Sequence, residues 1–398
     1  MEKNRLPKDG VACWIGELMR GVSREPAWNV ECRNSGRENQ WNYVDGCMML
    51  AFGELYKITG DGSLLSYIKQ FVDDFVAEDG SIRTYDADSF CLDNINEGKI
   101  LFPLLDQTGE PKYLNAIEAV YRNLREMPRT PSGSFWHKKI YPNQVWLDGL
   151  FMAMPFYMQY ETRYHHMRNY QDVVSQFLRV RERMQDEKTG LYYHGFDESR
   201  SADWADQETG LSKSFWLRAV GWLVMALTDT LEQMDEQIYY EYRSLCTMLK
   251  ELADALMPFQ HESGMFHQVI DRPQDEGNYL ETSGTCMISA GILKAVRLHL
   301  LPESYAAFAE RAFYGTAKRY FSDGGAHPKL GGICLVGGLG GPAKRDGTPG
   351  YYYGEPVVEN DGKGAAPFLL AYGELLRRSP DAVSGPRCIP NFAGGTLE

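Results

Sequence analysis

The sequence predicts an all-α protein, an (α/α)6 barrel in which six helical hairpins close into a ring. Three observations favour this fold. Apolar residues recur at helical spacing along the whole chain, whereas the sustained alternation typical of strands is scarce. Twelve helical segments can be delimited, and breaks between them are marked by glycine or proline, as at 59–62 and 107–111. These segments also alternate between small-residue-rich and charged compositions.

The predicted helices span residues 10–21, 44–58, 62–78, 93–107, 111–126, 146–163, 167–185, 214–234, 236–257, 281–300, 302–320 and 361–377. Six of them are rich in small residues, which permit close backbone approach, so we expect them to form an inner ring; they begin near Asp45, Asp93, Asp148, Arg218, Ser283 and Asp361. These starts are 48, 55, 70, 65 and 78 residues apart, enough for one hairpin and a loop. An open α-solenoid is the alternative, but its repeats are usually shorter and more uniform.

Composition indicates a globular protein and does not exclude a small anionic substrate. We expect residues 1–398 to form a single catalytic domain, because single-domain barrels of this length are common. The net charge of −13 disfavours nucleic acid and anionic membranes as partners, although local cations still admit a small anionic substrate. No run approaches the roughly 18–20 apolar residues of a membrane span, and residues 1–10 are polar, so we expect a cytoplasmic protein. The sequence does not indicate the oligomeric state.

Metal and nucleotide sites are not expected. The eight cysteines are scattered without a C-x-x-C pair, which favours free thiols over a disulfide framework. The adjacent His165 and His166 diverge on a helix, and no H-E-x-x-H motif exists. The glycine-rich run at 337–341 superficially resembles a phosphate loop, but Pro342 follows it and the G-K-[ST] ending is missing.

Four long loops precede inner helices, at 127–145, 186–213, 258–280 and 321–360. Loops of this length inside a compact domain are usually functional. In this topology they emerge at the same end of the ring as the N-termini of the inner helices, whose dipoles favour an anion. We therefore expect the active site at that end.

Two acids lie at junctions between such loops and inner helices. Asp148 stands between Trp146 and an apolar helical run, and Asp93 occupies a similar position. Each is either a helix cap or a carboxyl group for acid/base chemistry. Two carboxylates that enter helices from polar loops favour acid/base chemistry on a sugar.

An arginine between two indoles is the candidate for binding a carboxylate. Arg218 lies between Trp216 and Trp222, and its planar fork suits a carboxylate group. The alternative is a structural arginine stacked on the indoles. His194, in the preceding loop, is either a donor to a sugar oxygen or a residue that holds the loop.

Several motifs carry a resemblance to a known family. The run H-K-K-I-Y-P at 137–142, with W-L-D-G-L-F-M at 146–152, resembles the unsaturated rhamnogalacturonyl hydrolases, glycoside hydrolase family 105. Similar pieces lie at 193–198, 216–222, 268–271, 281–285 and 360–364, so that the resemblance spans roughly residues 41–375. Leu217 and Phe196 depart from the glycine and tryptophan that the family often has there, which affects the sugar subsites more than the reaction.

The resemblance implies an (α/α)6 barrel without metal or cofactor. It implies action on oligosaccharides whose non-reducing end is a 4,5-unsaturated uronic acid left by a polysaccharide lyase. By position, Asp148 would be the general acid/base and Asp93 its carboxylate partner. The residues that would shape the sugar site are Tyr43, His137, Lys138, His194, Trp216, Arg218 and Trp222.

This chemistry requires Asp148 to be protonated near neutral pH, because an unsaturated uronide is an enol ether whose C4 must receive a proton. We expect burial beside Trp146 and repulsion from Asp93 to raise the pKa of Asp148. Two other classes stay open. One is a different (α/α)6 carbohydrate enzyme, such as an inverting glycosidase or a sugar epimerase, and the other is a non-catalytic sugar-binding protein. The sequence does not indicate the aglycone, nor a galacturonyl as against a glucuronyl origin.

Overall fold

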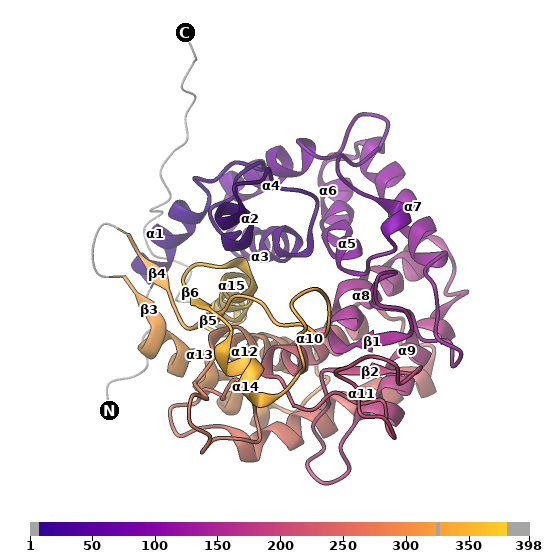
Figure 1. The fold of residues 1–398 in the computed structure, drawn as a ribbon. Coiled ribbons are helices and arrows are strands. Elements are labelled where there is room, and N and C mark those ends of the chain that lie inside the picture. Colours follow the sequence, from indigo (N-terminus) through magenta and orange to yellow (C-terminus); the bar gives the residue numbers. More distant parts are fainter. Residues whose placement is uncertain (1–7, 324–326, 380–398) are drawn as a thin grey trace.

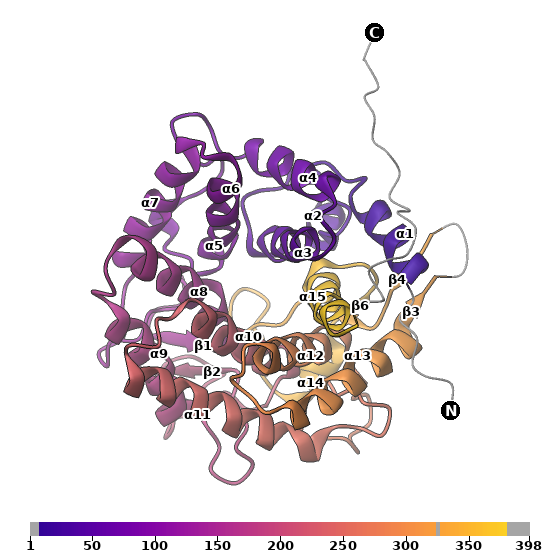
Figure 2. The same cartoon turned by 180° about the vertical axis from the view of Figure 1, so that it is seen from behind.

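The computed structural model describes residues 8–323 and 327–379, and these form a ring of helices in two layers (Figures 1 and 2). Each inner helix packs against the next, and the last closes on the first, so the predicted (α/α)6 barrel is confirmed. The inner layer consists of α3 (Tyr43–Thr59), α5 (Asp93–Asn96) continued by η2 (Glu97–Ile100) and α6 (Leu101–Thr108), α8 (Leu147–Tyr164), α10 (Leu217–Gln233), α12 (Thr282–Arg297) and α15 (Gly362–Arg378).

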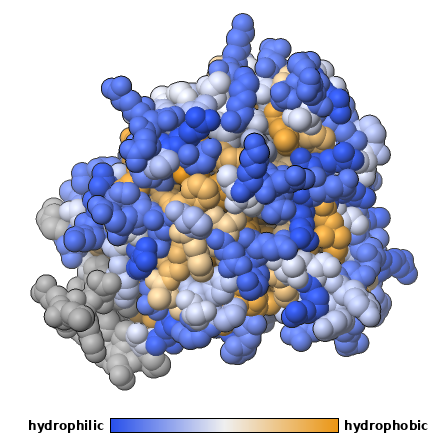
Figure 3. Space-filling view, turned by 90° about the horizontal axis from the view of Figure 1, so that it is seen from below, coloured by the Kyte–Doolittle hydropathy of each residue, from blue (hydrophilic) through white to orange (hydrophobic). Residues whose placement is uncertain are grey.

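The outer layer covers these helices with amphipathic ones. It consists of α1 (Lys8–Leu18), α4 (Gly62–Asp73), α7 (Pro111–Arg125), α9 (Tyr170–Met184), α11 (Tyr239–Leu256) and α13 (Ala306–Tyr320). Trp14 on α1, for example, is fully buried and meets Phe368 on α15 edge-on at 5.7 Å. The side of the molecule in Figure 3 is mainly hydrophilic, with hydrophobic residues visible between the hydrophilic ones. Within the described ranges, no helix combines the length and apolar character that a membrane crossing requires.

The structure differs from the predicted helices at three places. The short helices α2 (Val30–Ser35) and α14 (Pro349–Gly354) were not predicted, because six residues are too few to show a helical period. The helix expected at 93–107 is interrupted by the 3-10 segment η2. Pro103 has no N–H to donate to the carbonyl of Lys99, so a regular α-helix does not run through this stretch.

Short strands join the long loops at one end of the ring. The described residues contain three two-stranded antiparallel pairs: β1 (Gln144–Trp146) with β2 (Gly195–Asp197), β3 (Phe321–Ser322) with β4 (Lys329–Leu330), and β5 (Ile333–Cys334) with β6 (Val357–Val358). The first pair places Trp146 opposite Gly195. The strands β1, β2, β5 and β6 lie with α14 on the face toward the viewer in Figure 1, at the N-terminal end of the inner helices.

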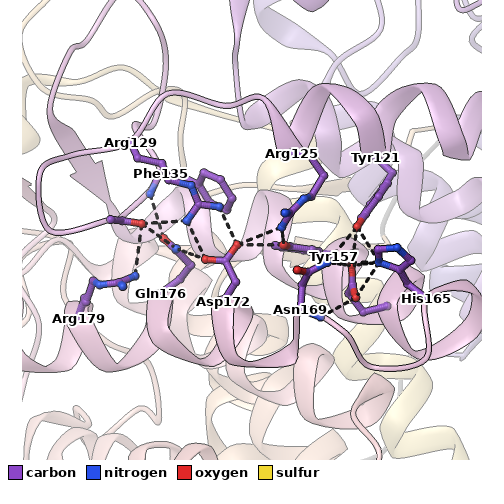
Figure 4. Close-up of polar contacts among 12 residues, drawn as sticks. Tyr121, Arg125, Arg129, Phe135, Tyr157, His165, Asn169, Asp172, Gln176 and Arg179 are labelled. Carbon is purple, nitrogen blue, oxygen red and sulfur yellow. Dashed lines mark hydrogen bonds and ion pairs between the residues drawn. The ribbon is translucent and has the colours of Figure 1, made fainter.

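The loop at 127–145 is tied to the outer helix α9. Arg129 donates two hydrogen bonds to the Asp172 carboxylate, at 2.7 and 2.6 Å, and the Tyr157 hydroxyl donates to the same group at 2.9 Å (Figure 4). The side chain of Gln176 accepts from the backbone N–H of Phe135 at 2.9 Å. These contacts hold the backbone just before His137.

His165, one of the adjacent histidines, joins α7 and α8. Its Nδ1 lies 3.1 Å from the Glu161 carboxylate, which also accepts a hydrogen bond from the Tyr121 hydroxyl at 2.6 Å (Figure 4). The seven cysteines in the described ranges are free thiols, and Cys388 lies outside those ranges. Among them, Cys47 and Cys286 are buried, whereas Cys246 is only partly buried.

The inner helix α8 contains a proline in its interior, and a buried lysine compensates for it. Pro155 has no N–H to donate to the carbonyl of Phe151. The Nζ of Lys99 donates to that carbonyl instead, at 3.1 Å, and lies 3.6 Å from the centroid of the Phe151 ring. Burial lowers the pKa of Lys99 from 10.5 to about 8. The ammonium form is therefore costly in the folded protein.

Replacing Lys99 with methionine is expected to raise the free energy of unfolding near pH 7. The pKa shift of Lys99 corresponds to about 3 kcal/mol, of which the lost hydrogen bond to Phe151 offsets about 1 kcal/mol. Between about pH 8 and 10.5 the unfolded lysine binds more protons than the folded one, so wild-type stability rises with pH. The advantage of the Lys99→Met variant should therefore shrink over that range in urea titrations. The exposed Lys57 is the control, and a Lys99→Met difference that does not depend on pH would contradict the prediction.

Candidate active site

Asp148, one of the two acids at inner-helix starts, lies against His194. Strand β1 leads directly into α8, so that Asp148 is the second residue of that helix. The pairing of β1 with β2 brings His194 beside it, and the N–H of Leu147 donates to the carbonyl of His194 at 3.1 Å. Asp148 Oδ2 lies 3.2 Å from His194 Nε2. These two buried atoms do not meet in hydrogen-bonding geometry, and neither has a hydrogen-bond partner among the described residues.

The second acid, Asp93, is the first residue of α5 and is held by two basic side chains. Its Oδ2 lies 2.6 Å from Lys138 Nζ, and its Oδ1 lies 3.5 Å from His137 Nε2. The backbone fixes this arrangement, because the N–H of Leu92 donates to the carbonyl of His137 at 3.1 Å. Gly149 leaves room for the same imidazole, since a Cβ at this position would lie 3.2 Å from His137 Nδ1. His137 therefore stands between the starts of α5 and α8.

Two indoles flank His194. The ring centroid of Trp146 lies 5.4 Å from that of His194, and Trp216 lies 4.8 Å from it. Trp146 also stacks on His137, at 4.4 Å. The glycine run at 337–341 packs on these rings, and a Cβ on Gly337 would collide with Trp216. The run therefore serves close packing against indoles at this end of the barrel.

Arg218 is buried near the same place, and it already donates hydrogen bonds to other groups of the protein. Its Nε donates to Ser283 Oγ at 2.7 Å, its Nη2 donates to the carbonyl of Cys334, and Glu281 lies 3.8 Å away. Its guanidinium lies 5.3 Å from the Trp216 ring centroid, so one of the two neighbouring indoles packs beside it.

The second indole, that of Trp222, packs against other rings. Trp222 stacks on Phe151 at 4.5 Å and meets Tyr43 edge-on at 6.4 Å. Tyr43 begins α3 and lies within electrostatic range of Asp93 and Arg218. Burial raises the pKa of Tyr43 well above its ordinary value, and nearby carboxylates including Asp93 add to this, so its hydroxyl keeps its proton.

The expected direction of the Asp148 pKa shift is wrong for the protein without substrate. Burial is the largest influence and would raise this pKa, but the nearby charge of His194, with a further contribution from His137, lowers it below the ordinary value. Burial lowers the pKa of His137 itself to about 4, so His137 is neutral near pH 7 and His194 is the partner that matters. Repulsion from Asp93 does not dominate, because Lys138 neutralises that carboxylate at 2.6 Å.

Sequence reasoning missed the buried groups that come from the later loops. Tyr352 on α14 was not among the predicted site residues, but it is fully buried and its hydroxyl lies 2.7 Å from His194 Nδ1. Gln268 supports it by donating to the carbonyl of Tyr352 at 3.3 Å. Periodicity carries no signal for such contacts. The run of three tyrosines at 351–353 was the one available indication.

Several buried polar atoms at this end of the ring have no hydrogen-bond partner among the described residues, which indicates a binding site there. Besides Asp148 and His194 they include His137 Nδ1, Trp216 Nε1 and Gln268 Oε1. Buried polar atoms normally have partners, so a polar ligand would satisfy these. A cavity of about 240 Å³ lies elsewhere, at the C-terminal ends of the inner helices, where the lining includes ion-paired groups such as Lys294 and Asp229. We propose that the active site lies at the N-terminal end, where these unpaired groups lie together.

Comparison with known proteins identifies the family. A model described as Glycosyl Hydrolase Family 88 matches residues 22–379. A solved structure from C. acetobutylicum, described as a glycoside hydrolase from family 105, is 38% identical, covers 91% of this chain and 99% of its own, and superposes with a TM-score of 0.83.

The chain is also similar to two curated proteins. Protein Atu3128 of Agrobacterium fabrum is 38% identical over 235 residues, which are 56% of this chain and 98% of that protein. The unsaturated rhamnogalacturonyl hydrolase YesR of Bacillus subtilis is 26% identical over 265 residues, which are 65% of this chain and 72% of that protein. This chain, with its ring of helices and its two helix-start acids, matches the family 88 model and belongs to glycoside hydrolase family 105.

Proposed function

We propose that this glycosidase removes a 4,5-unsaturated uronic acid from the non-reducing end of oligosaccharides produced by a polysaccharide lyase. A rhamnogalacturonan-derived disaccharide is the first candidate substrate, because YesR, whose name includes unsaturated rhamnogalacturonyl hydrolase, is a relative. The observation that carries the proposal is the buried Asp148–His194 pair at 3.2 Å, whose facing atoms have no hydrogen-bond partner in the described chain.

The proposed reaction begins with a proton and not with displacement at C1. Asp148 donates a proton to C4 of the enol ether, and positive charge develops at C5 and the ring oxygen. Water adds to C5 and returns a proton to Asp148, which leaves a hemiketal. The bond between C5 and the ring oxygen then breaks to give a ketone, and the hemiacetal formed at C1 expels the aglycone as an alcohol. One acid/base group thus serves both proton transfers.

Substrate binding raises the pKa of Asp148, which is lowered in the free protein. Asp93 and Lys138 form a pair of zero net charge, so a bound uronate adds an uncompensated negative charge near Asp148. A like charge and the exclusion of water both raise the pKa of a carboxyl group. A proton shared by the Asp148–His194 pair, whose facing atoms lie 3.2 Å apart, is then held on Asp148, where the reaction needs it.

The position of Asp93 argues against an ordinary two-carboxylate mechanism. Retaining and inverting glycosidases use a second carboxylate as a nucleophile or as a base near C1. Asp93 is held by Lys138 and His137, and an ion-paired carboxylate is a poor nucleophile. We propose that Asp93 stabilises the positive charge that develops at C5.

The remaining predicted residues form the walls of the proposed sugar site. Lys138 has a side chain that is 27% exposed, against 2% for Arg218, so we assign the substrate carboxylate to Lys138 and a supporting role to Arg218. Trp146 and Trp216 offer apolar faces to the sugar ring. Trp222 stacks on Phe151 and meets Tyr43 edge-on, so we assign it to the base of the sugar site next to Tyr43.

A panel of lyase products tests the proposal. Disaccharides generated from rhamnogalacturonan, other pectic polymers and glycosaminoglycans are incubated with the protein, and loss of the ultraviolet absorbance of the conjugated uronate is followed. We expect loss of absorbance with release of the aglycone, fastest for the rhamnogalacturonan product. Cleavage of a saturated disaccharide at an equal rate would favour an ordinary glycosidase. Binding without turnover would favour a sugar-binding protein.

A further inference from the structure

Tyr352 is fixed in place behind His194, on the side away from Asp148. Its hydroxyl lies 2.7 Å from His194 Nδ1, whereas Asp148 faces Nε2. The tyrosine is fully buried, and its ring stacks on Trp216 with centroids 5.4 Å apart and 16° between the planes. Its backbone carbonyl accepts from Gln268. The contact joins segments 158 residues apart in the chain.

A phenol suits this position because it both donates and accepts hydrogen bonds. When the Asp148–His194 pair holds one proton, Nε2–H faces the carboxylate and Nδ1 accepts from Tyr352. When the pair holds two protons, Nδ1 carries one and donates to the tyrosine oxygen, while the other lies between His194 and Asp148. Burial, with contributions from Tyr351 and Asp148, raises the pKa of Tyr352 well above its ordinary value, so the phenol stays neutral throughout.

We propose that Tyr352 is a positioning residue that orients the His194 imidazole and stabilises its Nδ1–H in the doubly protonated state of the Asp148–His194 pair. This inference rests on the proposed function, because that state is the one able to give Asp148 a proton for C4. Tyr352 itself touches neither Asp148 nor the substrate carbon. Its effect reaches the reaction through His194.

The other charged groups near His194 are left in place by a change at Tyr352. Asp148 faces it from α8. His137 lies within electrostatic range of His194, from the loop before β1, and it contacts Asp93 on α5. Lys138 holds that same Asp93 at 2.6 Å. A shift in the pH dependence after removal of the Tyr352 hydroxyl therefore reports on that hydroxyl.

Tyr352→Phe keeps the ring on Trp216 and removes only the hydroxyl. An Nδ1–H without an acceptor in a buried site disfavours the doubly protonated pair. We expect kcat to fall about tenfold with KM changed less than about twofold, and the alkaline limb of the kcat/KM profile to move down by about one pH unit. The matched control is Tyr353→Phe, on the same helix, whose hydroxyl donates to Asp275 at 3.1 Å. We expect wild-type profiles from it.

A second measurement separates this inference from the proposed function. In protein labelled with ¹⁵N-histidine, with His194 assigned from a His194→Gln variant, the His194 ring resonances should titrate at lower pH in Tyr352→Phe than in the wild type. In the wild type at low pH, the Nδ1–H should give a proton resonance protected from solvent exchange. Absence of that resonance overturns the inference even where the phenylalanine variant fails to fold.

The outcomes can be told apart. A wild-type protein that leaves unsaturated disaccharides intact contradicts the proposed function, while the resonance experiment still tests the Tyr352–His194 contact. A drop in kcat with an unchanged pH profile and unchanged His194 titration marks Tyr352 as a packing residue and overturns the inference. Equal behaviour of the Tyr352→Phe and Tyr353→Phe variants overturns it as well.

Discussion

Replacing Asp148 with asparagine is expected to reduce turnover of an unsaturated disaccharide by at least about 10³-fold, in the upper part of the range for a lost general acid. Asparagine has nearly the same shape but has no acidic proton to give to C4. The fold should be unaffected, because Asp148 Oδ2 makes no hydrogen bond in the described chain that would be lost. We expect a melting temperature close to that of the wild type and little change in KM.

The measurement is the loss of ultraviolet absorbance under saturating substrate, beside a thermal melt. Asp206→Asn is the control, because Asp206 is an exposed acid of the loop at 186–213 that accepts hydrogen bonds from Thr209. It should keep wild-type rates within about twofold. An Asp148→Asn variant that consumes the substrate at the wild-type rate would remove Asp148 from the mechanism.

Replacing Arg218 with methionine should give the largest loss of stability, about 3 kcal/mol. Arg218 is 2% exposed and lies 3.8 Å from Glu281, which is fully buried. Glu281 also caps α12 by accepting from the N–H groups of Ser283 and Gly284. Without the guanidinium, its negative charge is buried with hydrogen bonds but without a counter-charge. Urea titrations should show the loss, and kcat/KM should fall because the starts of α10 and α12 lose their link.

A double-mutant cycle identifies the cause of this loss. Combining Arg218→Met with Glu281→Gln removes the buried charge, so part of the lost stability should return. The control is Arg181→Met, because Arg181 pairs with Glu251 at 2.6 Å on the surface, with side chains 35% and 40% exposed. Its loss should stay below about 1 kcal/mol. Additive effects of the two buried substitutions would refute the charge argument.

Local features of the sequence predicted most of the fold. Helical periodicity is set by side-chain spacing along one segment, so the six inner helices were found within a few residues of their observed bounds. The places of Asp93 and Asp148 at helix starts follow from the same pattern. The short helix that carries Tyr352 and the strands β1 and β2 were missed, because six and three residues are too short to show a period.

The site was predicted only as a set of residues. The sequence named Arg218 as the candidate for a substrate carboxylate and Lys138 as a residue of the sugar site. In the structure each already pairs with groups of the protein itself. Trp222 was placed beside Arg218, yet its stacking partner is Phe151. These differences have one physical reason. The groups that a side chain contacts come from segments that are brought together only when the ring closes.

By itself, the sequence determined the class of fold, the end of the ring where the long loops gather, and the two acids that begin inner helices. Those features depend on residues close together in the chain. Only the tertiary structure decided that Asp148 faces His194, that Tyr352 lies behind it, and that the pKa of Asp148 is lowered. The physical reason is that a pKa depends on the charges and the burial around a group, and these come from segments far apart in the chain.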